Sequence, residues 1–295
     1  MSKLPHKTTV QIAATSNRRG FRPLFAILDV TAIEGSFTVK NVALITGASS
    51  GIGLELARVH ASRGGDLILV ARRLDRLNEI KDELQEKFGI EVEVLDMDLA
   101  RDNAGKELFE EIIRRQLPVD ILVNNAGFGG HGYFYEREWS RDHDMILLNI
   151  LTLTELTRMF LPSMVERGSG RILNVASMAG FIPGPFQAVY YATKAYVLSF
   201  SEAIASELDG SGVTVTALCP GPTKTEFEEV ANVAGSKAFM IQASVESVAR
   251  YGYKSMLKGR AVAVPGSANR LLVNYLLRMT PKNVARRVSK MLMEK

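Results

Sequence analysis

Short apolar runs and longer amphipathic stretches alternate along the chain from position 41 onward. The apolar runs predict strands over residues 42–46, 66–70, 92–95, 121–123, 171–175, 213–218 and 261–264. The amphipathic stretches predict helices over residues 52–62, 74–88, 104–116, 145–166 and 190–207. Strands that are apolar throughout and alternate with helices are typical of a parallel sheet covered on both faces. We therefore expect an α/β fold with a doubly wound parallel sheet of about seven strands.

A glycine-rich turn, Thr46-Gly-Ala-Ser-Ser-Gly-Ile-Gly53, lies between the first predicted strand and the first predicted helix. Glycine permits a tight turn and lets backbone N–H groups approach a pyrophosphate, and a helix N-terminus favours negative charge. This position matches the dinucleotide-binding turn of a single Rossmann-type sheet. The residues of the turn that we expect to contact a dinucleotide are Gly47, Ser49, Ser50, Gly51, Ile52 and Gly53.

The residues that close the second predicted strand bear on which dinucleotide binds. NAD-selective enzymes usually place a carboxylate about 20 residues past the glycines, where it bonds the ribose 2′-hydroxyl. This chain has Ala71-Arg72-Arg73 there instead. Because a guanidinium can pair bidentately with a 2′-phosphate, we predict NADP(H), with Arg72 as the contact. The alternative is that these arginines only begin a solvated helix.

Tyr190 and Lys194 lie four residues apart at the start of a predicted helix, so they share one helix face. Tyrosine has a reference pKa of about 10, which makes it a poor acid or base at neutral pH. A nearby ammonium stabilises the phenolate and lowers that pKa. Ser177 follows the fifth predicted strand, at the edge where parallel sheets carry their chemistry. These three residues form the predicted catalytic group.

Six motifs resemble those of the short-chain dehydrogenase/reductase family in order and spacing. They are the glycine-rich turn, Asn124-Asn-Ala-Gly127, Asn149, Ser177, Tyr190-Tyr-Ala-Thr-Lys194 and Pro220-Gly221. The resemblance covers about residues 41–265 and is nearest to bacterial-type oxidoreductases related to the 3-oxoacyl reductases. It implies an oxidoreductase that transfers hydride between a nicotinamide and a carbonyl or carbinol carbon, and a homodimer or homotetramer.

The resemblance implies a role for each matched position. Tyr190 would give a proton in reduction and take one in oxidation, and Lys194 would lower the Tyr190 pKa and hold the nicotinamide ribose. Ser177 would bind the substrate carbonyl, and Asn149 would complete a proton relay through water. The remaining implied cofactor contacts are Asp98 at the adenine, Thr223 at the nicotinamide carboxamide, and Leu99, Asn124, Ala126, Gly127, Pro220 and Gly221.

Apolar residues next to these motifs are candidates for the substrate side. They are Phe128, His131, Tyr133, Phe181, Pro183 and Phe186. The segment 223–243 holds Phe227, Phe239 and Met240 and is a candidate for a mobile lid. This set predicts a small hydrophobic carbonyl or alcohol substrate, such as an acyl chain, a steroid-like ring or an aromatic ketone. The alternative is that these side chains only pack in the core and loops.

The two ends of the chain are basic and its middle is acidic. Residues 1–40 carry six Lys or Arg against two Asp or Glu, residues 41–260 carry 23 against 29, and residues 261–295 carry seven against one. A nucleic-acid binder concentrates basic charge on its folded core, so we expect no nucleic-acid partner. Residues 1–40 predict a poorly ordered or loosely packed extension, and residues 41–265 the dinucleotide-binding and catalytic domain.

Residues 266–295 predict a basic amphipathic helical tail. Its apolar side comprises Leu271, Leu272, Tyr275, Leu276 and Met279, followed by Val284, Val288, Met291 and Leu292. We keep two interpretations open: this side packs against the body or a symmetric neighbour, or it makes peripheral contact with an anionic membrane. A cytoplasmic location is expected, with membrane association or organelle targeting by the basic N-terminal extension as alternatives.

Few residues suggest other chemistry. The four histidines and the single cysteine, Cys219, lack metal-ligand spacing, so we expect no metal site. Cys219 ends an apolar strand and is expected to be a small buried hydrophobe. The alternative function is a dinucleotide-sensing regulatory protein with the same fold, which the intact Ser177, Tyr190 and Lys194 argue against. An epimerase or dehydratase would need a larger substrate domain than the short chain after Arg260 provides.

Overall fold

The computed structural model describes residues 41–233 and 235–294, so the predicted N-terminal extension lies outside the described residues. The described part contains one seven-stranded sheet in the order β3–β2–β1–β4–β5–β6–β7, with every pair parallel. This arrangement confirms the predicted doubly wound α/β fold. The strands are β1 (Val42–Thr46), β2 (Asp66–Ala71), β3 (Val92–Asp96), β4 (Ile121–Asn124), β5 (Gly170–Val175), β6 (Val213–Leu218) and β7 (Val262–Ala263).

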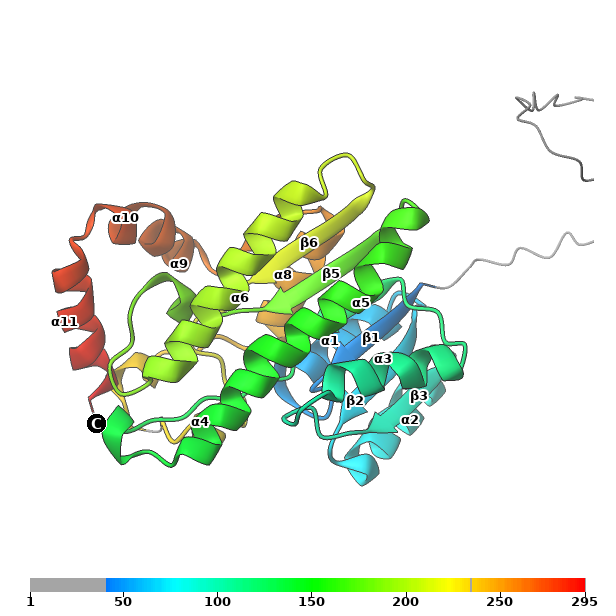
Figure 1. Ribbon diagram of the computed structural model, residues 1–295, viewed down its shortest axis with the longest axis horizontal. Helices are drawn as coiled ribbons and strands as arrows, with labels where there is room; N and C mark the ends of the chain where they lie inside the picture. Colours follow the sequence, from blue (N-terminus) through cyan, green and yellow to red (C-terminus); the bar gives the residue numbers. More distant parts are fainter. Residues whose placement is uncertain (1–40, 234, 295) are drawn as a thin grey trace, which may run out of the picture. The chain divides into compact units, whose positions relative to one another are not determined.

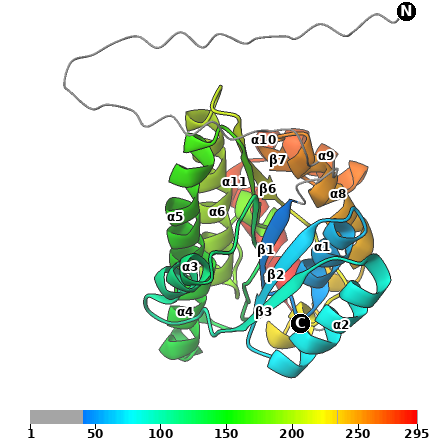
Figure 2. The same cartoon turned by 90° about the vertical axis from the view of Figure 1, so that its right-hand side faces the viewer.

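Helices cover both faces of the sheet (Figures 1 and 2). One face carries α1 (Gly51–Ala61), α2 (Leu74–Phe88) and α8 (Val245–Leu257). The other carries α3 (Ala104–Arg114), α5 (Leu153–Glu166) and α6 (Ala188–Glu207). Successive strand residues point to opposite faces, and in β1 both Leu44 and Ile45 are buried, each in a different cluster. This two-sided burial is why the strands read as continuous apolar runs.

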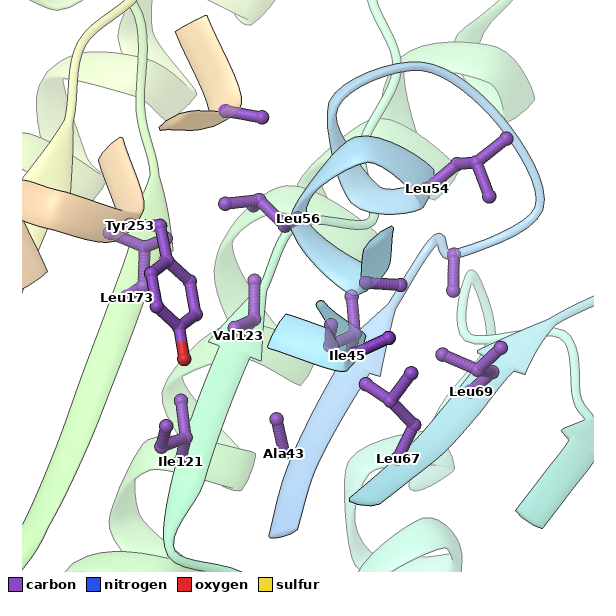
Figure 3. Close-up of a cluster of buried hydrophobic side chains, with 14 of the residues drawn as sticks. Ala43, Ile45, Leu54, Leu56, Leu67, Leu69, Ile121, Val123, Leu173 and Tyr253 are labelled. Carbon is purple, nitrogen blue, oxygen red and sulfur yellow. The ribbon is translucent and has the colours of Figure 1, made fainter. Parts of the chain in front are cut away.

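The core under α1 and α8 shows how the strands position the first helix. Figure 3 shows Ile45, Leu69 and Val123 projecting from neighbouring strands toward Leu56 of α1. Tyr253 of α8 lies over the same layer. This packing fixes α1, and with it the glycine-rich turn at its N-terminus, against the carboxyl ends of the strands.

His60 of α1 is a buried polar group within this face of the fold. Its Nδ1 lies 2.8 Å from the Tyr253 hydroxyl, and its Nε2 lies 2.9 Å from the Asn41 carbonyl oxygen and 3.1 Å from that of Asp66. Two carbonyl acceptors at Nε2 assign the ring proton to that nitrogen, so Nδ1 accepts from Tyr253. Burial lowers the pKa of His60, which favours this neutral form.

A single long helix runs from α4 (Trp139–Ile146) through a π-helical turn (Leu147–Thr152) into α5. It begins at Trp139, before the predicted start at 145, because the polar first turn hides the helical period. By length and composition it is the one described helix that could cross a membrane. Its buried residues Leu156, Phe160 and Met164 pack in the core beside α3, as those of a sheet-covering helix do.

The C-terminal segment is helical, as predicted, and lies off the carboxyl edge of the sheet (Figure 1). It comprises α9 (Ser267–Leu271), a π-helical turn (Leu272–Leu276), α10 (Leu277–Met279) and α11 (Lys282–Met293). Val273 packs against Val264 and the buried Cys219, which ties this π-helical turn to the sheet edge. Met293 is buried against Ala231 and Val233, in the segment that contains α7 (Phe227–Val230). The two segments therefore dock on each other.

Candidate active site

The glycine-rich turn between β1 and α1 needs glycine for two separate reasons. Gly47 and Gly51 have φ of +66° and +56°, in the left-handed region that side chains disfavour. Gly53 has no room for a side chain, because a Cβ there would overlap the Gly47 carbonyl oxygen and the Asn125 amide. The turn is therefore packed directly against the end of β4.

Asn125 and Thr46 hold this turn in place. The Asn125 Nδ2 donates to the carbonyl oxygens of Thr46 and Gly47, at 2.9 and 3.0 Å. The Thr46 hydroxyl oxygen accepts the backbone N–H groups of Asn125 and Ala126, at 3.1 and 3.0 Å. These bonds leave the glycine-rich turn as a rigid cradle beside the carboxyl ends of β1 and β4.

Asn124 does not take the position expected of a cofactor contact. Its side chain is buried on the other face of the sheet, where Nδ2 donates to Thr157 Oγ1 at 3.1 Å and to Asn174 Oδ1 at 2.9 Å. Asn125 lines the site instead. Strand alternation explains the correction: adjacent residues point to opposite faces, and the sequence alone did not show which asparagine faced the turn.

A cavity of about 1390 Å³ opens along the carboxyl edge of the sheet. Ligand pockets usually measure about 300–1,000 Å³, so this one has room for a dinucleotide and a second molecule. The predicted residues that line it are Gly47, Ser49, Ser50, Gly51, Ile52, Arg72, Asp98, Leu99, Ala126, Gly127, Ser177, Tyr190, Lys194, Pro220, Gly221 and Thr223. Gly53, Asn124 and Asn149 do not line it.

Two arginines stand where β2 ends, and both line the cavity. Arg73 donates to Ser49 Oγ at 3.1 Å and pairs with Glu226, with 3.0 Å between Nη2 and Oε2. Arg72 makes no ion pair within the described part of the chain. The fold also brings Glu226 to these arginines from the segment 223–243, a contact that the sequence did not show.

Ser177, Tyr190 and Lys194 come together in this one cavity. Ser177 lies two residues past the end of β5, where its Oγ accepts the Ala179 N–H at 3.1 Å, and its hydroxyl neighbours the Tyr190 phenol. The Lys194 ammonium donates to the Val175 carbonyl oxygen at 2.8 Å and lies 5.8 Å from the centre of the Tyr190 ring. The arrangement offers a carbonyl two hydroxyl donors beside a buried cation.

The two titratable members of this group shift in directions set by burial. Burial raises the pKa of Tyr190 above its ordinary value, and the neighbouring Ser177 hydroxyl offsets part of the rise. Burial also lowers the pKa of Lys194 to about 8. The expected depression of the Tyr190 pKa by Lys194 is therefore absent from this structure. The reason is that desolvation outweighs a cation that is directed at the Val175 carbonyl.

Asn149 sits behind the cavity wall, on the π-helical turn. Its Nδ2 donates to the Phe128 carbonyl oxygen at 3.0 Å and to Thr193 Oγ1 at 3.1 Å, and its Oδ1 accepts the Phe128 N–H at 3.2 Å. A Cβ built on Gly127 would lie 2.8 Å from Asn149 Oδ1 and 3.5 Å from Lys194 Nζ. Asn149 is thus placed to position the Gly127 loop and neighbour Lys194, without touching the open cavity.

The substrate side has a different lining from the one expected. Phe128, Phe227, Phe239 and Met240 line the cavity, as predicted. His131, Tyr133, Phe181, Pro183 and Phe186 do not. His131 and Phe186 instead stack with their ring centres 5.6 Å apart, and His131 Nε2 lies 2.9 Å from the Met293 carbonyl oxygen. These rings anchor the end of α11.

The C-terminal helices form another part of the cavity wall. Their cavity-lining residues are Leu272, Leu276, Leu277, Thr280, Val284, Ala285, Val288, Ser289 and Leu292. The apolar side of α11 therefore faces the cavity, which supports the interpretation that the tail packs against the body. Leu271, Tyr275, Met279 and Met291 are exposed and lie outside the cavity lining, and a membrane contact through them stays a prediction. The amphipathic pattern was visible in the sequence, but not its partner.

Several known proteins are similar to this chain in sequence. Residues 41–234 match the family model described as short chain dehydrogenase. A short chain dehydrogenase of Pseudocercospora fijiensis is 36% identical over 192 residues, which cover 63% of this chain and 61% of that protein. The very-long-chain 3-oxoacyl-CoA reductase of Rattus norvegicus is 29% identical over 79% of this chain and 76% of its own.

A solved structure extends the similarity to the fold. The short-chain dehydrogenase from Sphingobium yanoikuyae in complex with NADPH is 33% identical, and the match covers 80% of this chain and 92% of that one, with a TM-score of 0.74. The P. fijiensis match spans less than two thirds of that relative's length. Fold and relatives together support an oxidoreductase that uses a nicotinamide dinucleotide, and they do not favour the regulatory-protein alternative.

Proposed function

Because this chain belongs to the short chain dehydrogenase family, we propose that it is an NADP(H)-dependent oxidoreductase that interconverts a hydrophobic ketone and its alcohol. One observation carries the proposal: Ser177, Tyr190 and Lys194 open into a cavity whose remaining wall is largely apolar. The candidate substrates are a 3-oxoacyl chain, a steroid-like ketone and an aromatic ketone. The R. norvegicus relative is named for the first of these.

The chain's own residues would hold the dinucleotide as follows. The backbone N–H groups of the glycine-rich turn and the start of α1 suit a pyrophosphate. Arg72 has no carboxylate partner in the described part of the chain, so it is available to a 2′-phosphate, which favours NADP(H) over NAD(H). Lys194 would hold the nicotinamide ribose. When bound, the dinucleotide supplies the hydride in reduction and accepts it in oxidation.

The acid–base work falls to Tyr190 in the reductive direction. Ser177 and Tyr190 donate hydrogen bonds to the substrate carbonyl oxygen, and Tyr190 passes its proton to that oxygen as negative charge develops there. The raised pKa of Tyr190 keeps the phenol protonated at neutral pH, which is the form a proton donor needs. The Lys194 ammonium then stabilises the phenolate that remains, because it lies beside the ring in a buried site.

The test measures NADPH oxidation by absorbance against a panel of 3-oxoacyl thioesters, steroid ketones and aromatic ketones. Tyr190→Phe should lower kcat by about a thousandfold, as expected for loss of a general acid, while the Kd for NADPH changes by less than about twofold. Tyr196→Phe, on an exposed part of the same helix, is the matched control and should keep wild-type turnover. Tyr190→Phe turnover above about a tenth of the wild-type rate would overturn the assignment.

A further inference from the structure

Two polar side-chain atoms in the cavity wall have no hydrogen-bond partner among the described residues. They are Oγ of Ser289, on α11, and Nε2 of Gln187, the residue before α6. Both residues line the cavity and are buried, at 2% and 3% exposure. A buried polar atom left unpaired destabilises the fold, so proteins retain few of them, and those that face a cavity point to a ligand.

Both residues neighbour a third polar residue, Tyr191. Gln187 and Tyr191 lie one turn apart, with the Tyr191 N–H bonded to the Gln187 carbonyl oxygen at 3.0 Å, so they share a face of the first turn of α6. Ser289 neighbours the Tyr191 phenol closely enough to offset part of the pKa rise that burial causes there. Tyr191 lines the same cavity as Tyr190, with the ring centres 6.1 Å apart.

The cluster is therefore beside the reacting position and separate from it. Tyr190 and Ser177 serve the carbonyl that is reduced, whereas Gln187, Tyr191 and Ser289 present hydroxyl and amide donors a short distance away. Apolar residues of α11, Val288 and Leu292, flank Ser289 in the wall. A donor cluster in apolar surroundings suits a neutral oxygen acceptor better than an anion, which would lack a compensating charge there.

We propose that Gln187, Tyr191 and Ser289 form a subsite that binds a second oxygen of the substrate. The substrate is then an apolar ketone that carries another oxygen function, either a carbonyl of an ester or thioester or a hydroxyl. This inference rests on the proposed reductase function and deepens it. Ser289 lies on α11, beyond residues 41–234, so the family match does not supply it. These residues position the substrate, and the proton transfer remains with Tyr190.

The test compares three ketones of equal chain length: a 2-alkanone, a 3-oxoalkanoate ester and a hydroxyketone. Ser289→Ala and Tyr191→Phe should each lower kcat/KM for a two-oxygen ketone by about three- to tenfold, the effect of one neutral hydrogen bond. We expect the loss mainly in KM, because the bond is made equally in ground and transition states. The 2-alkanone should change by less than about twofold.

Thr280→Val is the matched control. Thr280 also lines the cavity, but its hydroxyl already donates to the Leu276 carbonyl oxygen at 2.6 Å. Its replacement should leave the ratio of kcat/KM between two-oxygen ketones and the 2-alkanone unchanged. A Ser289→Ala effect on the ester alone identifies the second oxygen as a carbonyl, and one on the hydroxyketone alone identifies a hydroxyl. Equal losses for all three ketones, or no loss, would overturn the subsite.

A stability measurement gives a readout without substrate. Because Ser289 Oγ has no partner, the ligand-free Ser289→Ala variant should have a Tm equal to or above that of the wild type. Thr280→Val should have a lower Tm, since it removes a formed hydrogen bond. A clearly lower Tm for Ser289→Ala would show a structural role and contradict the subsite. Absence of turnover with any ketone would instead count against the reductase function itself.

Discussion

The dinucleotide half and the substrate half of the cavity are built in different ways. The dinucleotide half consists of strand ends and the turns that follow them, held by short bonds such as those between Asn125 and the glycine-rich turn. The substrate half consists of the segment 223–243 and α9–α11, which dock on each other through Met293. The register of the sheet fixes the first half, whereas packing and hydrogen bonds outside the sheet fix the second. We therefore expect changes in each half to be felt separately.

Reversing the charge of Arg72 should have the largest effect, a loss of activity with NADPH. Arg72→Asp should lower kcat/KM for NADPH by about a hundredfold, because a carboxylate would repel a 2′-phosphate that the guanidinium attracts. The value for NADH should stay the same or rise, and the ranking of ketones should not change. Arg76→Asp is the control, since Arg76 pairs with Glu79 outside the cavity. Equal losses for NADPH and NADH would contradict the role of Arg72.

Weakening the contact of α11 with the segment 223–243 should have a smaller effect, on substrate binding. Met293→Ala removes a buried anchor from the cluster with Ala231 and Val233, a change that costs about 2–5 kcal/mol in a packed core. KM for bulky apolar ketones should rise by about tenfold, while the Kd for NADPH changes by less than about twofold. Met291→Ala, on the exposed side of the same helix, should have no such effect. A parallel loss of NADPH affinity would show that the halves are coupled.

The smallest expected effect concerns the core beneath both halves. Burial lowers the pKa of His60 below 6.5, so at acidic pH the unfolded chain takes up a proton that the folded chain does not. Stability should therefore be unaffected above about pH 7.5 and fall on acidification below about pH 6.5, by at most about 1.4 kcal/mol per pH unit. Urea unfolding at several pH values measures this slope.

Two variants assign the slope to His60. His60→Gln should flatten it between about pH 7 and 5, whereas His143→Gln, at an exposed site, should retain it. Neither the choice of ketone nor the preference for NADPH should change in the His60 variant at neutral pH, because the ring lies outside the cavity lining. Identical slopes in the two variants would assign the acid sensitivity to other groups.

The contrast between the halves also explains which features the sequence could predict. The parallel sheet of about seven strands and the meeting of Ser177, Tyr190 and Lys194 followed from apolar periodicity and from the common edge of parallel strands. Asn124 was predicted to line the cofactor site in place of Asn125, because the two have the same side chain and point to opposite faces of the sheet. The Tyr190 pKa was misjudged because desolvation depends on depth in the fold. The homo-oligomer and the cytoplasmic location stay predictions.

The part of the cavity wall that α9–α11 form was harder to predict, for a physical reason. The amphipathic pattern shows that the apolar side of α11 turns away from water. It does not show whether that side lines a cavity, packs on another protein or contacts a bilayer. Ser289 carried no motif that would separate it from an ordinary helix serine. Only the docking of Met293 beside His131 reveals that Ser289 lies in the cavity wall.

The π-helical turn at Leu147–Thr152 lets one long helix pack against two different parts of the protein. In a regular α-helix, positions eleven apart return to nearly the same side, since each residue advances the helix by about 100°. Met145 and Leu156 have that spacing, yet Met145 packs beside Tyr190 and Leu156 packs in the sheet core. The wide turn thus rotates the second part of the helix relative to the first, so the same helix supports Tyr190 near its start and covers the sheet farther along.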